Sequence, residues 1–428
     1  MERRRFLGTV GIITGGAILG HQQINFSMPS SLKEFLTNET DNEVLWKTIR
    51  EQFVFPKDYI YLNTGGIGAV PSLVLKDVDK NMYEDEIYPS AGHDLKKWLE
   101  VKEKCSTLLS NDCHTDELAL VSTATEGINI IISGLPLKEG DEVITSSHEH
   151  PAVHIPLLNK MKRDGIKIRV FEPDLKNSHG NVERIEKLVN KKTRLIFISH
   201  ITCTTGQCFP LKEIGELARL RNIWFAVDAA QAAGTIPEII NNMDIDFYTF
   251  SGHKWTLGPK RTGVLYVRKD LLDLLKPTYV GAYSDDGYDI NKGDLKYNST
   301  AQRYEYATQN ESLFIGLGTA VDFINTIGIQ KIREHNIKLA EEFYFSLKKL
   351  NGVQVMSPEE KQYRSAIISF KISELNNNEV AGHFSKKRIR VRVVHEAGLD
   401  CIRVSFHLYN THDDLEKIIN EINFLVKG

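Results

Sequence analysis

Short apolar runs alternate with amphipathic segments between about residues 94 and 269. The runs are nearly continuous in Val, Ile, Leu, Phe and Ala, as in strands that are buried on both faces of a sheet. The segments between them repeat apolar residues every three or four positions, which is the period of a helix with one buried face. We predict strands at 117–123, 141–147, 166–173, 194–202, 223–230, 244–252 and 262–269, and helices at 94–110, 124–135, within 151–163, at 183–190 and at 211–221.

This alternation predicts an α/β fold, in which a mainly parallel seven-stranded sheet is flanked by helices. After residue 311 the pattern changes to a long helical stretch and then a smaller α+β region with strands at 366–372, 389–394 and 402–408 and a closing helix at 412–426. The Asp/Gly/Tyr-rich 281–300 and the Asn-rich 376–378 are predicted as loops. The predicted parts are a signal segment at 1–25, an N-terminal segment at 26–60 that packs with the small domain, a large domain at 61–310 and a small C-terminal domain at 311–428.

The composition and charge exclude some classes of protein. The chain has 428 residues, with 53 Lys+Arg against 56 Asp+Glu and a formal net charge of −3. This near-neutral balance lacks the basic excess of a nucleic-acid-binding protein. The five cysteines form no C-x-x-C pair, so we expect neither a zinc finger nor a dense disulfide framework.

The N-terminus has the layout of an export signal. Three arginines, Arg3 to Arg5, precede an uncharged stretch at 6–20, which is shorter than the roughly twenty residues of a membrane span. The order Arg3-Arg4-x-Phe6-Leu7 resembles a twin-arginine signal, which the export machinery recognises. We therefore predict a periplasmic protein. Because no A-x-A cleavage site follows, the alternative is an N-terminal anchor that is retained in the membrane.

Lys254 is the first candidate for chemistry, because it directly follows a strand that is apolar up to Phe250. Lysine is rarely buried without a partner. A lysine at such a strand end is suited to form a Schiff base with a carbonyl cofactor. The alternative is an exposed loop lysine beside the turn at Gly252.

Asp228 closes the predicted strand 223–230 and is the second candidate. A buried carboxylate needs a cationic partner, and the protonated ring nitrogen of pyridoxal phosphate is such a partner. Gln231, three residues further on, is placed to hydrogen-bond the ring oxygen of that cofactor. The alternative for Asp228 is the capping of a following helix.

The segment Ser-Thr-Ala-Thr-Glu-Gly at 122–127 lies where a predicted strand gives way to a helix. Backbone N–H groups at a helix N-terminus bind phosphate, and Thr125 adds a hydroxyl. The alternative is ordinary helix capping. No Walker motif and no G-x-G-x-x-G at a strand–helix junction occurs in the sequence.

Three histidines, His148, His150 and His154, follow the predicted strand 141–147. Imidazoles at such spacing are able to bind zinc, but no carboxylate or cysteine is obviously placed to complete the site. We therefore predict no metal and expect a histidine here to stack on an aromatic ring at the same edge of the sheet.

Five motifs in order resemble the aminotransferase class V family, a group of pyridoxal-phosphate enzymes of fold type I. They are STATEG at 122–127, SSHEHP at 146–151, FAVDAAQAAG at 225–234, SGHKW at 251–255 and RVSFHLYNT at 403–411. The resemblance implies that pyridoxal 5'-phosphate is the cofactor and that Lys254, Asp228 and His150 are catalytic, with His150 stacked on the ring. It also implies that a second subunit completes each site, through Thr308 in RYEYATQN. The remaining implied contacts are Gln231 to the ring oxygen, Ala124, Thr125, Ser251 and His253 to the phosphate, and Arg403 and Asn63 to the substrate.

Departures from the family pattern guide the prediction of the reaction. Cysteine desulfurases of this family carry a reactive cysteine on a loop shortly before the substrate arginine. Here the stretch contains only Cys401, two residues before Arg403, which disfavours persulfide chemistry. The segment HITCTTG at 200–206 resembles isopenicillin N epimerase-like members instead, with Cys203 in an open role. Arg261 stands where glycine is common and is a candidate for a substrate or dimer contact.

The predicted function is chemistry at the Cα of an amino acid or peptidic substrate, of the aminotransferase or epimerase type, in an exported homodimer. The alternatives are a pyridoxal-phosphate-dependent C–S or β-lyase, a catalytically silent binding protein with this fold, and a metal-dependent hydrolase built on the three histidines.

Overall fold

The computed structural model describes residues 29–38, 42–89, 94–110, 112–237, 240 and 243–427. The predicted signal segment at 1–25 lies outside these described residues. Among them, no single helix is long and apolar enough to cross a membrane, although the bent pair of α9 (Glu311–Ile327) and α10 (Ile329–Lys348) passes that test jointly by length and composition.

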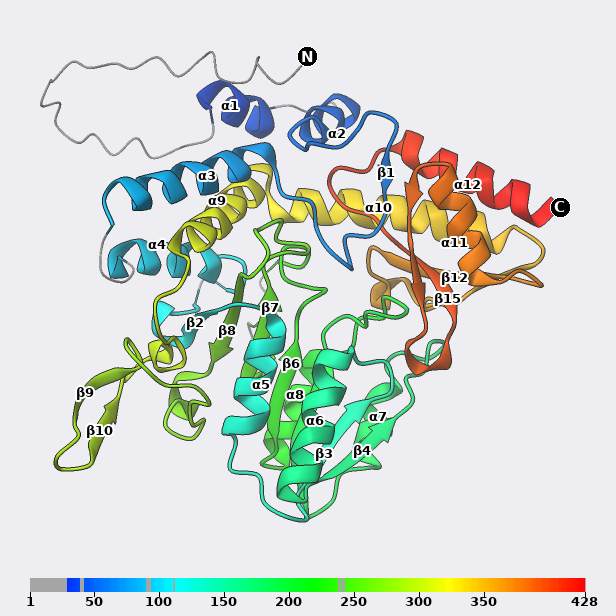
Figure 1. Ribbon diagram of the computed structural model, residues 1–428. Coiled ribbons are helices and arrows are strands. Elements are labelled where there is room, and N and C mark those ends of the chain that lie inside the picture. The colour runs from blue at the N-terminus through cyan, green and yellow to red at the C-terminus, as the bar shows by residue number, and fades with distance from the viewer. Residues whose placement is uncertain are drawn as a thin grey trace, which may run out of the picture.

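A seven-stranded sheet forms the centre of the molecule (Figure 1). The adjacent strands β4, β3, β5, β6 and β7 pair in parallel in that order across the sheet. Strand β8 pairs antiparallel with β7 on one side and with β2 on the other. The predicted α/β class with a mainly parallel seven-stranded sheet is therefore confirmed. In order across the sheet the strands are β2 (Leu118–Val121), β8 (Gly263–Val267), β7 (Phe247–Ser251), β6 (Trp224–Asp228), β5 (Thr193–Ser199), β3 (Glu142–Ser146) and β4 (Lys167–Phe171).

Both faces of the sheet are covered, because successive strand residues enter different hydrophobic clusters. In β6, Phe225 and Val227 belong to one cluster and Ala226 to the other. This alternation is the two-residue period of a strand, and burial on both faces explains why the runs are apolar throughout. The helices α5 (Ala124–Gly134) and α6 (Pro151–Asp164) cover one face, and α4 (Leu95–Ser106), α8 (Leu211–Leu220) and α9 (Glu311–Ile327) cover the other.

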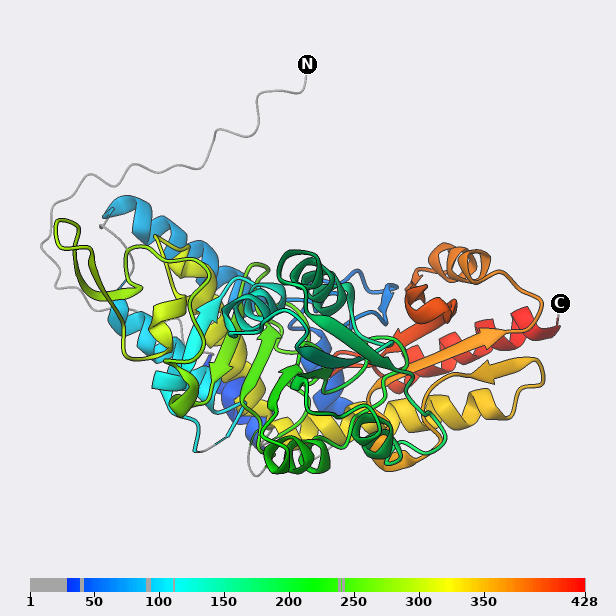
Figure 2. The same ribbon diagram turned by 90° about the horizontal axis from the view of Figure 1, so that it is seen from below.

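A smaller α+β part lies at one end of the molecule (Figures 1 and 2). Its antiparallel sheet has the order β11 (Val353–Val355), β12 (Ile367–Ile372), β15 (Cys401–Ser405) and β14 (Arg392–Val394). The helices α10 (Ile329–Lys348), α11 (Asn377–Lys386) and α12 (His412–Lys427) share a core with this sheet. Near this core, β1 (Ile60–Tyr61) pairs with β13 (Ile389–Arg390).

Helices α9 and α10 join the two parts and meet at Gly328 with a bend of 77°. A φ of +93° at this position favours glycine. Helix α9 packs against α3 (Ser72–Ile87) and α4, beside the large sheet, whereas the sequence analysis assigned 311–428 to the small domain.

The N-terminal helices α1 (Ser30–Asn38) and α2 (Asn42–Arg50) lie against both parts (Figure 1). Leu36 in α1 belongs to the core of the large sheet, and the Trp46 ring in α2 stacks on His335 of α10 at 3.9 Å. The Arg50 guanidinium forms an ion pair of 3.0 Å with Asp414 in α12. The remaining helix α7 spans Asn181–Glu186, and short 3₁₀ helices span Thr115–Glu117, Lys269–Leu271, Ala301–Tyr304, Lys361–Tyr363 and Glu396–Gly398.

Two predicted loops are wrong. Part of 281–300 forms an antiparallel hairpin of β9 (Asp285–Asp289) and β10 (Asp294–Tyr297), which projects from the body (Figure 1). Its exposed strands have no buried face and hence no apolar alternation to reveal them. The run of asparagines is the start of α11, where the Asn376 side chain accepts a hydrogen bond of 2.8 Å from the N–H of Asn378. Asparagine favours both loops and helix caps, so composition alone does not separate the two.

Candidate active site

A cavity of about 280 Å³ lies at the carboxyl ends of the central strands. In an α/β sheet this is the edge where ligands bind, because strand ends and helix N-termini meet there. Ser199 ends β5, Asp228 ends β6 and Ser251 ends β7. His150 lies after β3 and Lys254 lies after β7, and all five residues line the cavity. The fold thus brings together His150, Asp228, Ser251 and Lys254, which were predicted from three separate motifs.

The Lys254 side chain enters the cavity from a closely packed turn. The N–H of Gly68 donates to the carbonyl of His253 at 2.7 Å, and a Cβ at position 68 would stand 1.8 Å from the carbonyl oxygen of Lys254. Only glycine permits this approach. Burial lowers the pKa of the Lys254 amine, and the Asp228 carboxylate opposes that shift. The turn therefore presents an amine that loses its proton more readily than ordinary lysine.

The Asp228 carboxylate lies in the same cavity and is only 5% exposed. Its Oδ1 accepts a hydrogen bond of 2.9 Å from the N–H of Ala230. Burial raises the pKa of Asp228, and the Lys254 ammonium opposes that shift. In the described part of the chain, Asp228 has no ion-pair partner within 4.0 Å. A buried carboxylate without a paired cation fits a ligand that brings its own positive charge.

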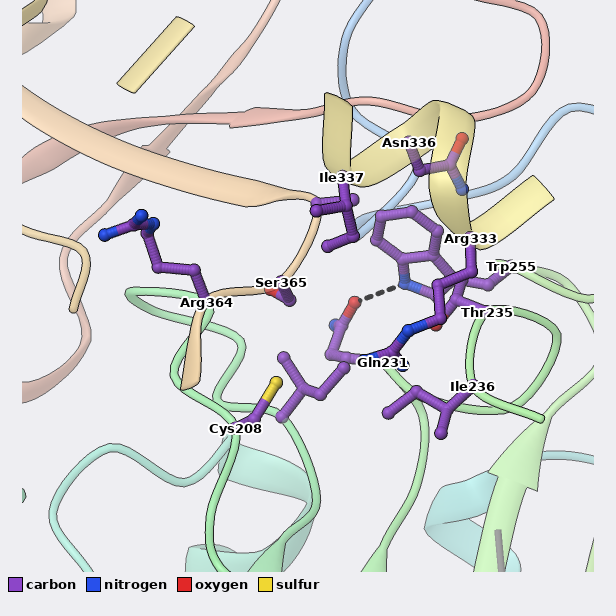
Figure 3. A pocket seen from close by; sticks show the side chains of 12 residues that line it. Cys208, Gln231, Thr235, Ile236, Trp255, Arg333, Asn336, Ile337, Arg364 and Ser365 are labelled. Atoms are coloured by element: carbon purple, nitrogen blue, oxygen red, sulfur yellow. Dashed lines mark hydrogen bonds between the residues drawn. The ribbon is translucent and has the colours of Figure 1, made fainter. Parts of the chain in front are cut away.

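Gln231 forms part of the cavity wall between Asp228 and the loop at Gly65. The same residue also lines a second, much smaller cavity of about 20 Å³, where its amide meets the indole of Trp255 (Figure 3). The side chain therefore separates the two spaces.

His150 is fixed by capping the helix that follows it. Its Nδ1 accepts a hydrogen bond of 3.1 Å from the N–H of Ala152, so the proton of the neutral ring lies on Nε2. Burial together with nearby Lys254 lowers the pKa of His150 to about 4. A neutral ring at the cavity wall suits the predicted stacking role, which stays a prediction.

His148 and His154, the other two histidines of this segment, bind groups outside the cavity lining. His148 Nε2 lies 3.2 Å from Glu172 Oε1, and His154 Nε2 lies 2.9 Å from the carbonyl of Ser146. Within the described ranges, no group of three or more His, Cys, Asp or Glu side chains is arranged to hold a metal ion. The three histidines therefore do not converge.

Glu149 is a buried acid that the sequence analysis did not identify as functional. Its carboxylate accepts a hydrogen bond of 2.6 Å from Ser146 Oγ and a short one from Ser199 Oγ, whose residue lines the cavity. Burial raises the pKa of Glu149 to about 7, and the neighbouring Asp228 adds to that shift. The only signal in the sequence was its place between two histidines.

The N-terminus of α5 opens on the cavity through Thr123, Ala124 and Thr125. The N–H of Ala124 donates to Ser251 Oγ at 2.9 Å, which ties the helix start to the end of β7. His253 also lines the cavity, and its Nδ1 is buried without a hydrogen-bond partner among the described residues. A helix start with hydroxyls and an unpartnered imidazole fits a phosphate group. The four predicted phosphate contacts therefore share one corner.

Arg403 and Asn63, the predicted substrate contacts, lie together behind the cavity wall. Arg403 Nη2 donates to Asn63 Oδ1 at 3.1 Å, and its Nη1 donates to the carbonyl of Cys203 at 2.7 Å. The guanidinium is fully buried and its Nε has no partner in the described structure. A Cβ on Gly65 would stand 3.2 Å from Arg403 Cζ, so the glycine loop runs close to this group.

A second arginine, Arg392, lines the cavity itself and was missed. It forms a short ion pair with Glu396 at the rim. The segment that follows β14 contains positive φ angles at Ala397, Gly398 and Asp400. In the sequence this arginine is one of five basic residues in the seven positions 386–392, with nothing to single it out.

Neither cysteine near the site is an activated thiol. Cys203 lines the cavity, and burial raises its pKa to about 11. Cys401 is fully buried in β15, and burial raises its pKa to about 11 as well. Since the thiolate is the nucleophile, both side chains are poorly reactive at neutral pH.

Thr308 and Arg261 are exposed and do not line the cavity. Arg261 has φ +68° and Ala307 has φ +57°, a backbone region that favours glycine. The φ at Arg261 explains why glycine is common at that position in the family pattern. The predicted contact of Thr308 with a second subunit stays a prediction.

Comparison with known proteins decides the family. The model of the family "Aminotransferase class-V" matches residues 76–418. The chain belongs to the aminotransferase class V family. Its site contains the cavity lysine, the unpaired buried carboxylate and the phosphate corner that pyridoxal phosphate requires, and pyridoxal phosphate is the cofactor of this class V enzyme.

Several similar proteins are named cysteine desulfurases. The chain is 29% identical to a probable cysteine desulfurase from Methanothermobacter thermautotrophicus, over 86% of this chain and 95% of that protein. It resembles the apo cysteine desulfurase from Thermococcus onnurineus at 25% identity, with a TM-score of 0.80 over 89% of this chain and 98% of the other. It also resembles a lysine variant of C-DES that carries glycine covalently linked to pyridoxal phosphate, at 26% identity and a TM-score of 0.79 over 87% and 98% of the chains.

Replacement of Glu149 by Gln tests the buried acid. The folded protein holds a proton on Glu149 that the unfolded chain releases between pH 4.5 and about 7. The wild-type protein therefore loses stability as the pH rises through this window, and the Glu149→Gln variant does not. We expect the free energy of unfolding, measured by urea titration at both ends of the window, to shift in favour of the variant as the pH rises. A difference that is independent of pH would contradict the assignment.

Proposed function

We propose that the protein is a pyridoxal-phosphate-dependent C–S lyase that releases sulfur from a cysteine-derived amino acid by β-elimination. The relatives named above are cysteine desulfurases, and C-DES is described as a cystine C–S lyase whose reaction product is cysteine persulfide. This supports the C–S lyase alternative better than the aminotransferase or epimerase that we had favoured. The carrying observation is that the rim segment at 392–403 brings an arginine to the cavity and no thiol.

Bound pyridoxal phosphate supplies an electron sink for charge that develops at Cα. The protein residues would then divide the work. Among the described residues, Lys254 is the one lysine that lines the cavity, so its amine is the base that takes the Cα proton. Asp228 holds the proton on the ring nitrogen, and the helix start at Thr125 with Ser251 holds the phosphate. Arg403, which lies directly behind the cavity wall and whose Nε lacks a partner among the described residues, would orient the α-carboxylate from there.

The fate of the sulfur follows from the lack of a reactive thiolate at the cavity. A desulfurase that passes sulfur to its own cysteine needs a reactive thiolate at the cavity, but Cys203 and Cys401 both have pKa values raised to about 11. In β-elimination the Cβ–S bond breaks with both electrons on sulfur, and the proton removed from Cα returns to the leaving sulfur. The remaining aminoacrylate adds water and yields pyruvate and ammonium, so no enzyme thiol is required.

The experiment is a product analysis of the holoenzyme with L-cysteine and L-cystine. We expect pyruvate and ammonium in a one-to-one ratio with released sulfide or persulfide. Lys254→Ala abolishes turnover, because the base is lost. Cys203→Ser gives the same products as the wild type, because its thiol takes no part.

Other products would separate the rivals. Alanine as the main product would overturn elimination in favour of desulfuration, and dependence of that alanine on Cys203 would assign the sulfur acceptor. A D-amino acid or an amine-transfer product from a panel of amino acids, with no pyruvate, would restore the epimerase or aminotransferase hypothesis. Absence of any change in the cofactor spectrum would favour the silent binding protein.

We also propose a homodimer in which each site is completed by the partner. The projecting β9–β10 hairpin exposes Tyr288, Ile290 and Leu295, which are 73%, 83% and 51% exposed. An isolated hairpin is marginal in water, and apolar side chains on it suit a second copy of the chain. Light scattering of the pure protein should give twice the chain mass, and a monomer would contradict this proposal.

Export through the twin-arginine pathway remains our proposal for residues 1–25. Its support is the Arg3-Arg4-x-Phe6-Leu7 pattern alone. Cell fractionation should find the wild type in the periplasm and an Arg3→Lys/Arg4→Lys variant in the cytoplasm. Equal distribution of the two would contradict the proposal.

A further inference from the structure

The orientation of the Gln231 amide is determined by two unambiguous neighbours. The indole N–H of Trp255 donates to Gln231 Oε1 at 2.8 Å (Figure 3), and Gln231 Nε2 donates to the carbonyl of Gly65 at 2.9 Å. An indole N–H only donates and a carbonyl only accepts, so the amide has a single consistent orientation. Its NH₂ group retains a second hydrogen, and Gln231 lines the active-site cavity.

Trp255 is held from behind by a buried histidine. His407 Nε2 lies 3.0 Å from the carbonyl of Trp255, and the two rings meet edge to face at 5.2 Å. Since the carbonyl only accepts, Nε2 carries the proton and Nδ1 is the acceptor. Burial lowers the pKa of His407 to about 3, which keeps the ring neutral.

The chain of hydrogen bonds ends on the small part of the molecule. His407 Nδ1 lies 3.1 Å from Asn336 Nδ2, which is therefore the donor, and Asn336 belongs to α10. Asn336, His407 and Trp255 are each at most 1% exposed, and Gln231 is 4% exposed. From α10 to the glycine loop the residues in the series are Asn336, His407, Trp255, Gln231 and Gly65. In each bond the residue nearer to α10 is the donor.

We propose that Asn336, His407 and Trp255 are positioning residues, which hold the Gln231 amide so that an N–H faces the cofactor's ring oxygen. They act through Gln231 and do not line the active-site cavity themselves. Trp255 directly follows Lys254, so the same residue that orients the amide also fixes the backbone next to the cavity lysine. The inference rests on the cofactor and holds whichever reaction the enzyme catalyses.

The decisive variant is Trp255→Phe, which keeps an aromatic ring and removes the N–H donor. Without this donor the Gln231 amide keeps only its bond to the Gly65 carbonyl, so its N–H is held less firmly toward the cavity. When Gln231 donates an N–H to the ring oxygen, that oxygen binds the proton shared with the lysine-bound nitrogen less tightly. Loss of this N–H donor therefore raises the pH midpoint of the cofactor's visible absorbance. We expect proton affinity to rise and pyridoxal phosphate affinity to fall, each by roughly twofold to tenfold, the worth of one hydrogen bond.

Trp98→Phe is the matched control. Trp98 is 2% exposed, similar to the 1% of Trp255, and it packs against Phe314 away from the cavity. Both variants should lower the melting temperature, but Trp98→Phe should leave the absorbance midpoint and the affinity for pyridoxal phosphate unchanged. A purely structural role for Trp255 would make the two variants alike.

Two substitutions of His407 test the next bond. His407→Gln can place a side-chain N–H near the carbonyl of Trp255, and His407→Leu cannot. We expect the Leu variant to shift the midpoint in the same direction as Trp255→Phe, and the Gln variant to restore it at least in part. Wild-type midpoint and cofactor affinity in the folded Trp255→Phe protein would overturn the proposal, whatever the His407 variants show.

Discussion

The site depends on two opposite charges that share one cavity without pairing. Lys254 and Asp228 come from adjacent strands, and each shifts the pKa of the other against the effect of burial. A direct ion pair would satisfy both groups and leave little for a ligand to gain. Held apart, the carboxylate awaits a cation and the amine awaits a carbonyl. Pyridoxal phosphate offers both, so the cost of burying these groups is offset by cofactor binding.

The surrounding packing keeps this arrangement in place. In the loop at 65–68, Gly65 lies close to Gln231, Ser405 and Arg403, and Gly68 lies so close to the backbone of Lys254 that a side chain there would clash. The small part of the molecule supports the cavity wall in two ways. Arg403 of β15 donates to the carbonyl of Cys203, which lines the cavity, and Asn336 of α10 is linked through His407 and Trp255 to Gln231. The cavity is thus closed by hydrogen bonds between the two parts as well as by packing within the large sheet.

The fold was predictable because its strands are buried on both faces, so their apolar runs stand out from the helical period. The β9–β10 hairpin was not, because an exposed hairpin has no such period. Lys254, Asp228 and His150 could be predicted to lie at one site because a polar residue at the end of a buried strand is unusual and because the motifs occur in order, and all three line the cavity. Arg392, Glu149 and the bond between Trp255 and Gln231 were not found, since their roles arise from contacts between distant segments. The sequence showed that the loop cysteine of cysteine desulfurases is absent here. It did not show that a C–S lyase, which needs no such cysteine, is a better hypothesis than an aminotransferase or epimerase.

Borohydride reduction of the holoenzyme, followed by peptide mass spectrometry, tests the central claim most directly. Reduction fixes the cofactor to whichever amine it occupies. The account predicts a pyridoxyl adduct on the peptide that contains Lys254, and a much weaker adduct when Asp228 is replaced by Ala, because the ring nitrogen then lacks its carboxylate. An adduct on another lysine, or none on a protein that binds pyridoxal phosphate, would contradict it.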